Sequence, residues 1–240
     1  MARTSTPRAG APDDLEPRKL PRQARSRATF HAILDACGQV LASGSYEALT
    51  TNAISERAGV SIGTLYEYFP NREAIVAALV AESCGEIVRR MRQAVEEAMS
   101  LPTFQGMEHL LAAGIEALGA HDNMIRTLLR DAPFVVQLPA YLQTREALTE
   151  LCQDIGLRSA AHLTLPDPAT DTWLISQMLF GAMMEIASQQ VPDSRRATLR
   201  LELARLTFRM TMGRDPRPHE AAKAPAESEP RLGSVVGSGV

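Results

Sequence analysis

Cysteine and aromatic side chains are scarce in this sequence of 240 residues. The three cysteines, Cys37, Cys84 and Cys152, are odd in number, and their spacing fits neither a disulfide framework nor a zinc site. We expect them to be small buried side chains in a reducing cytoplasm. No glycine-rich phosphate loop is present, and the histidines show no metal-ligand spacing, so no cofactor and no metal are predicted. These histidines are His31, His109, His121, His162 and His219.

Long apolar runs and a strong charge imbalance are also missing. No stretch approaches the ~18 apolar residues that a membrane span needs, and the first residues are followed by proline and charge rather than by a secretory signal. The chain has 25 Lys and Arg against 28 Asp and Glu, a net charge of −3. This balance excludes a protein that coats a polyanion with its whole surface, so any contact with nucleic acid must come from a local patch.

Both ends of the chain are rich in proline and poor in large apolar residues. Such segments bury too little surface to offset the entropy of ordering, and we expect disordered tails at residues 1–22 and 213–240. The N-terminal tail ends in a basic run. Between the tails, the sequence favours a first domain over residues 23–83 and a second over residues 84–212.

The body of the chain shows helical periodicity and no alternating strand pattern. The first amphipathic helix ends near Gly44, and after two short helical patterns Asn71 is a plausible N-cap for a long helix. The segment 171–189 is apolar on nearly every side, which predicts a helix with little solvent-facing surface. We expect an all-α fold of about nine helices. The other predicted helices cover residues 104–120, 122–131, 140–162 and 193–212.

Residues 49–72 carry the most specific pattern. They predict two short helices, capped by Thr51 and Ser61, with a left-handed turn at Gly59 between them. Leu65 and Phe69 of the second helix are expected to point into the core. Two short helices joined by a glycine turn are what a helix-turn-helix requires.

The remaining side chains of this segment suit a DNA duplex. The second helix begins with small, uncharged residues that fit the major groove, while hydroxyl groups and a cation flank them for phosphate contacts. The basic run before the first helix is placed to reach the DNA backbone or an adjacent minor groove. The candidate DNA-binding residues are Thr51, Ser61, Ile62, Gly63, Thr64, Tyr66, Tyr68 and Arg72.

Together these residues resemble the N-terminal domain of the TetR family of transcriptional regulators. The resemblance rests on Leu49-Thr50-Thr51, Ala58-Gly59-Val60-Ser61 and Leu65-Tyr66-Glu67-Tyr68-Phe69-Pro70-Asn71-Arg72, within residues 24–80. It implies that the eight candidates touch double-stranded operator DNA. The sequence departs mildly from the family at Ser55, Tyr68 and Arg72, where alanine, histidine and lysine are common.

The resemblance also implies a C-terminal domain that binds a small ligand and forms a homodimer through its last two helices. The apolar 171–189 helix and the Leu199, Leu203, Leu206 and Met210 seam agree with this. We expect a repressor that a mainly apolar effector releases from DNA. Bulky, adaptable side chains are the candidates for the effector pocket. They are Met107, Met124, Phe134, Tyr141, Trp173, Met178, Phe180 and Met184.

Two other functions remain open on the sequence. Gly59-Val60-Ser61-Ile62-Gly63 matches the G-x-S-x-G pattern of serine hydrolases, with Ser61 as nucleophile, but that pattern needs a preceding buried strand. The other alternative is a helical adaptor whose helix-turn-helix no longer binds DNA.

Overall fold

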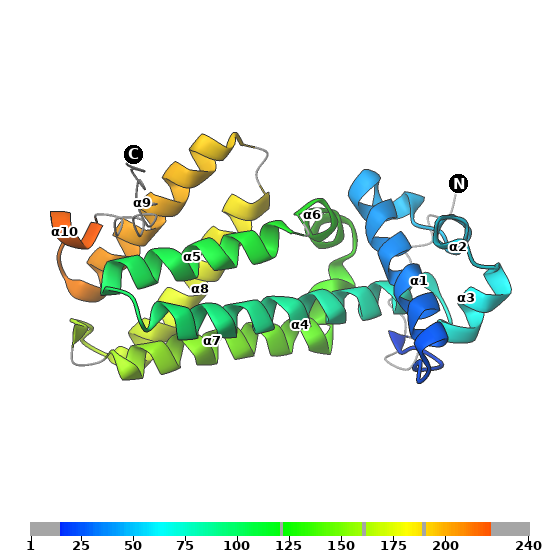
Figure 1. The fold of residues 1–240 in the computed structure, drawn as a ribbon, viewed down its shortest axis with the longest axis horizontal. Coiled ribbons are helices and arrows are strands. Elements are labelled where there is room, and N and C mark those ends of the chain that lie inside the picture. The colour runs from blue at the N-terminus through cyan, green and yellow to red at the C-terminus, as the bar shows by residue number, and fades with distance from the viewer. Residues whose placement is uncertain (1–14, 121, 160–161, 189–190, 222–240) are drawn as a thin grey trace, which may run out of the picture.

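The computed structural model describes residues 15–120, 122–159, 162–188 and 191–221, and all regular secondary structure in these ranges is helical. The expected all-α fold is thereby confirmed. The molecule is elongated, with a small three-helix domain at one end and a long helical body at the other (Figure 1). The helices are α1 (Ala24–Ser43), α2 (Thr51–Ala58), α3 (Ile62–Tyr68), α4 (Arg72–Ala98), α5 (Thr103–Gly119), α6 (Asp122–Asp131), α7 (Pro139–Arg158), α8 (Pro168–Ser188), α9 (Asp193–Met212) and α10 (Pro218–Ala221), with 3-10 turns η2 (Tyr46–Ala48) and η3 (Pro133–Gln137).

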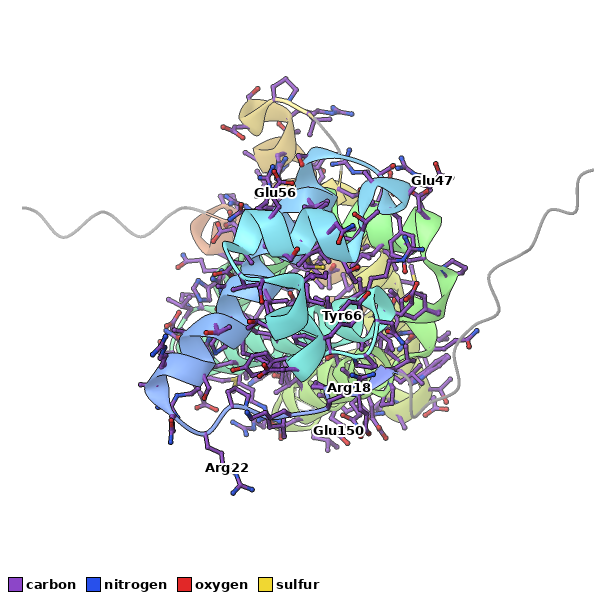
Figure 2. All side chains as sticks on the ribbon, turned by 90° about the vertical axis from the view of Figure 1, so that its right-hand side faces the viewer. Arg18, Arg22, Glu47, Glu56, Tyr66 and Glu150 are labelled. Carbon is purple, nitrogen blue, oxygen red and sulfur yellow. The ribbon has the colours of Figure 1, made fainter. Side chains whose placement is uncertain are left out.

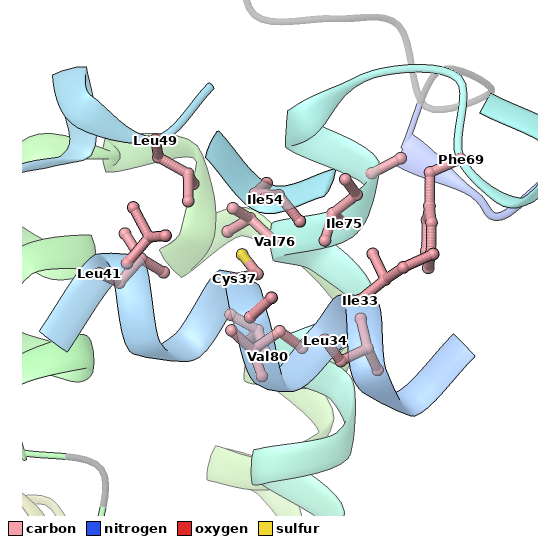
Figure 3. Packing of buried hydrophobic residues seen from close by; sticks show 14 of the residues in the cluster. Ile33, Leu34, Cys37, Leu41, Leu49, Ile54, Phe69, Ile75, Val76 and Val80 are labelled. Carbon is pink, nitrogen blue, oxygen red and sulfur yellow. The ribbon is translucent and has the colours of Figure 1, made fainter. Parts of the chain in front are cut away.

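One apolar core holds the small domain together. The predicted inner face of α1 is buried, and it meets side chains of α2, α3 and the first turns of α4 around Cys37 (Figure 3). Burial raises the pKa of the Cys37 thiol to about 12, which keeps it protonated and unreactive. The core continues into α6, so the small domain and the body share packed side chains.

The helix ends follow from local hydrogen bonds. Asn71 caps α4 as predicted, because its Oδ1 accepts a hydrogen bond of 2.7 Å from the backbone N–H of Ala74. The prediction that Thr51 caps α2 is wrong by one residue: the hydroxyl oxygen of Thr50 accepts from the N–H of Ala53 at 3.1 Å. Thr50 is the last residue with an extended backbone before α2, which is the conformation that an N-cap requires.

The folded part of the chain extends beyond the predicted limits at both ends. Residues 15–22 lie against the small domain, where Leu15 packs on its core. At the other end, α10 follows α9, and the Arg214 guanidinium donates to the Glu220 carboxylate at 2.8 and 2.9 Å. The rest of the expected tails, residues 1–14 and 222–240, lies outside the described residues.

Candidate nucleic-acid interface and internal cavity

The turn between α2 and α3 has the geometry that the sequence predicts. Gly59 adopts a left-handed conformation with φ 66° and ψ 30°, which a side chain would strain. The backbone N–H of Val60 then donates to the Ser55 carbonyl at 3.1 Å, closing the end of α2. On the inner side of α3, Leu65 is fully buried, so the opposite side of the helix faces solvent.

The solvent-facing side of α3 is free of large charged groups at its N-terminal end. Ser61 and Gly63 are exposed, and Ile62 keeps 39% of its surface accessible. A Cβ atom at Gly63 would find only the Ser61 hydroxyl, at an ordinary contact distance of 3.8 Å. Packing within the chain therefore does not require glycine at position 63. A close approach of the α3 backbone to an external surface would require it.

Hydrogen bonds fix several of the candidate hydroxyls. The Tyr66 hydroxyl lies 3.2 Å from Thr51 Oγ1, which joins the middle of α3 to the start of α2. The Ser61 hydroxyl oxygen accepts from the Thr64 N–H at 3.1 Å and lies 2.9 Å from Thr64 Oγ1. Six of the eight candidates, Thr51, Ser61, Ile62, Gly63, Thr64 and Tyr66, are thus brought together around α3.

Tyr68 is not on this surface. Only 6% of it is exposed, and its ring packs edge-on against Phe30 with the ring centres 6.0 Å apart. The Lys19 ammonium covers the ring at 5.9 Å from its centre. The prediction that Tyr68 faces DNA is not supported, because the last turn of α3 rotates this residue toward α1.

Arg72 is also used within the protein. Its guanidinium donates to the Leu49 carbonyl at 3.1 Å and to the Glu73 carboxylate at 2.8 Å, and it lies 4.6 Å from the centre of the Tyr46 ring. Burial, followed by the Glu73 carboxylate, raises the pKa of Tyr46 to about 12. Arg72 thus ties the start of α4 to the η2 segment of the small domain rather than to an external phosphate, and Tyr46 in turn contacts the Phe134 ring.

The segment before α1 places Arg18, the first residue of the basic run in the sequence, against the end of α3. The Arg18 backbone N–H donates to the Tyr68 carbonyl at 2.8 Å, and its guanidinium donates to the Tyr66 carbonyl at 3.1 Å. These bonds cap the C-terminal end of α3 and place a cation at the negative end of the helix. Figure 2 shows Arg18 beside Tyr66 and Arg22 projecting from the same end of the molecule. The cluster of basic residues was visible in the sequence, but its contact with α3 depends on tertiary structure.

The body contains a partly open cavity of about 410 Å³ between α4, α5, α7, α8 and α9. Most of its lining is apolar, and its volume lies within the range of ligand sites. A second, smaller cavity of about 50 Å³ lies between α4, α6, α7 and α8, next to the small domain. Within the described ranges, no group of three or more potential metal-ligating side chains is present.

The predicted pocket residues divide among these places. Met107 and Phe180 line the large cavity. Phe180 also lines the small one, together with three further candidates: Met124, Tyr141 and Met184. Phe134 packs on the core of the small domain.

Trp173 and Met178 point away from the interior and contradict the pocket prediction. They are 48% and 59% exposed, and Leu174 beside them is 47% exposed. On α9, Leu206 and Met210 are 48% and 41% exposed. The sequence predicts little solvent-facing surface for α8. In the single chain, α8 instead exposes Trp173, Leu174 and Met178 to solvent. Exposed apolar faces on two adjacent helices are typical of a surface that a partner covers.

Comparison with known proteins agrees with the geometry of the small domain. Residues 33–79 match the family described as bacterial regulatory proteins, tetR family. The fatty acid metabolism regulator protein of Bacillus subtilis is 23% identical over 188 residues, which cover 73% of this chain and 90% of that protein. The transcriptional repressor KstR of Rhodococcus jostii is 47% identical over 51 residues, 21% of this chain and 24% of that repressor.

A solved structure shares the fold over most of this chain. The regulator FadR from Bacillus subtilis, in complex with stearoyl-CoA, superposes with a TM-score of 0.59 at 20% identity. The match covers 74% of this chain and 97% of that one. The similarity therefore extends beyond the helix-turn-helix to the fold of the body. No helix in the described part of this chain is long and apolar enough to cross a membrane.

Proposed function

Because this chain belongs to the TetR family of DNA-binding transcriptional regulators, we propose that it is a homodimeric, cytoplasmic repressor. It binds a palindromic operator through α3 and leaves the operator when a mainly apolar effector occupies the body. The observation that carries the proposal is the outer side of α3. At its N-terminal end the exposed residues, Ser61, Ile62 and Gly63, are uncharged, and no packing contact within the chain requires Gly63 to be glycine.

The proposed contacts of α3 with DNA are of two kinds, contacts to base edges and contacts to phosphate oxygens. Ile62 and Gly63 are placed to meet base edges and a thymine methyl group, whereas the linked hydroxyls of Thr51 and Tyr66 suit phosphate oxygens. Ser61 and Thr64 add hydroxyls at the tip of the helix. Tyr68 and Arg72 are left out of the proposed interface, because the domain itself uses both side chains.

Dimerisation through α8 and α9 completes the DNA-binding unit. The exposed apolar side chains of these two helices supply a self-complementary face for a two-fold partner. A two-fold dimer presents two α3 helices to half-sites about 34–36 Å apart, one turn of the duplex.

The large cavity supports control by an effector. The related FadR structure contains stearoyl-CoA, and the lining of the cavity here is mainly apolar. Binding in the body favours a dimer whose α3 helices no longer match the half-site spacing, and the operator is then released.

Removal of one hydroxyl tests the proposed interface. Tyr66→Phe deletes a hydrogen bond to a charged phosphate, so we expect operator affinity to fall about tenfold with the fold unchanged. The operator is selected from random duplexes, and binding is measured by fluorescence anisotropy.

Tyr46→Phe is the matched control. Its hydroxyl lies 3.4 Å from Glu73 Oε1 inside the domain, and its loss is expected to leave operator affinity within twofold. Equal affinity for the wild type and for Tyr66→Phe would show that α3 does not read DNA as proposed.

The serine-hydrolase alternative is disfavoured by the same geometry. The residues before Ser61 form helix α2 instead of a buried strand, and the Ser61 oxygen caps α3. The relatives named above are regulators, which agrees with a protein that is not an enzyme.

A further inference from the structure

The charges around the large cavity are of one sign. Among the described residues that line it, the ionisable groups include the guanidiniums of Arg145 and Arg158 and the imidazole of His162, and there is no aspartate or glutamate. An apolar cavity bordered only by basic groups complements a ligand that has an apolar body and a negative charge.

The two guanidiniums differ in how their charge is balanced. Arg158 forms an ion pair of 2.7 Å with Asp154, one turn earlier on α7. Arg145 forms no ion pair with any described residue. Its Nη2 donates to the Gln177 amide oxygen at 2.6 Å, and the Gln177 Nε2 donates to Thr149 Oγ1 at 3.2 Å. Arg145 is solvent-exposed, and neutral protein groups hold its guanidinium in place without a carboxylate partner among the described residues.

Arg145 also lies at one end of the cavity. The lining residues of α7 and its C-cap run from Arg145 to Ser159, about 20 Å along the helix. The Arg145 guanidinium is 5.8 Å from the centre of the Phe180 ring, and both residues line the smaller cavity near the small domain as well. An extended chain that follows α7 thus has its charged end beside Arg145.

We propose that the effector is an amphipathic anion with an extended apolar chain, and that Arg145 binds its anionic head. The chain lies along α7 toward Ser159, and Gln177 orients the guanidinium from α8. A carboxylate and a phosphate are both anions that a guanidinium fork binds in two-point geometry. This inference rests on the proposed role of the large cavity as the effector site.

Calorimetric titration of the full chain with three probes tests the head group. The probes are palmitate, hexadecanol and palmitoyl-CoA, each below its critical micelle concentration. Wild-type protein should bind palmitate or palmitoyl-CoA at least tenfold more tightly than hexadecanol. Arg145→Gln should remove this difference and leave hexadecanol binding unchanged.

Arg158→Gln is the matched control, and it should bind all three probes like the wild type, because Asp154 already neutralises Arg158. If Arg145→Gln weakens palmitate alone, the bound anion is a carboxylate; if it weakens palmitoyl-CoA alone, the anion is a phosphate. Both results support the proposal. Equal binding of the anionic probes by wild type and Arg145→Gln would overturn it, as would hexadecanol binding as tight as that of the anions.

Two further measurements separate this inference from the proposed function. Ile155→Trp fills the apolar part of the cavity and should abolish binding of every probe, whereas unchanged binding would place the site elsewhere and overturn the inference. Operator binding is followed on the same preparations. Operator binding without uptake of either anion overturns the effector chemistry alone, whereas wild-type protein that binds no operator overturns the regulator itself.

Discussion

Phe69→Ala is expected to lower the free energy of unfolding by about 3–5 kcal/mol, as is typical when a large buried aromatic side chain is truncated. Phe69 is fully buried at the end of α3, and its ring centre lies 4.9 Å from that of Phe30 on α1. The substitution leaves a void where α1 and α3 meet. Urea denaturation, followed by circular dichroism, measures the loss.

Ile62→Ala is the matched control for this prediction. Ile62 lies on the same helix but faces solvent, so we expect a change in the free energy of unfolding of less than about 1 kcal/mol. Its operator affinity should nevertheless fall, because the side chain is placed to meet the groove. A loss of less than about 1 kcal/mol for Phe69→Ala would contradict the position of α3 in the core.

Met178→Glu combined with Leu206→Glu is expected to convert the proposed dimer to a monomer and to reduce operator affinity by about 100-fold or more. Both side chains are about half exposed in the single chain, and burying two charges in a self-complementary apolar face is strongly unfavourable. A monomer also loses the gain in affinity that two linked half-site contacts provide, about 10²–10⁴. Analytical ultracentrifugation and fluorescence anisotropy measure the two effects.

Leu157→Glu provides the control for the dimer prediction. Leu157 is an apolar residue of α7 with 76% of its surface exposed, outside the α8 and α9 faces. This variant should stay dimeric and keep its operator affinity. If the Met178→Glu and Leu206→Glu protein remained dimeric, the partner surface would lie elsewhere on the chain.

Short-range patterns account for most of what the sequence predicted correctly. The buried face of α1, the left-handed Gly59 and the Asn71 cap all depend on residues close in the chain, where helical spacing and capping chemistry act. The α2 cap was misplaced by one residue, because the η2 turn before it was not recognised.

The other errors concern contacts between distant parts of the chain. The burial of Tyr68 depends on Phe30 and on Lys19, and the role of Arg72 depends on carbonyl groups more than 20 residues away. A bulky apolar side chain in a helix pattern also looks the same whether it lines a cavity or faces a partner. The sequence could not separate Phe180, which lines the cavity, from Trp173, which is half exposed.

The most direct test of the account is operator binding by the full chain as a function of salt concentration. Fluorescence anisotropy is recorded on the selected operator and on a duplex of scrambled sequence. We predict binding to the operator at least about 10³-fold tighter than to the scrambled duplex, with affinity that falls linearly on a log–log plot as phosphate contacts are screened. Equal, weak binding to both duplexes would contradict a regulator that reads DNA through α3 and would favour a helical adaptor.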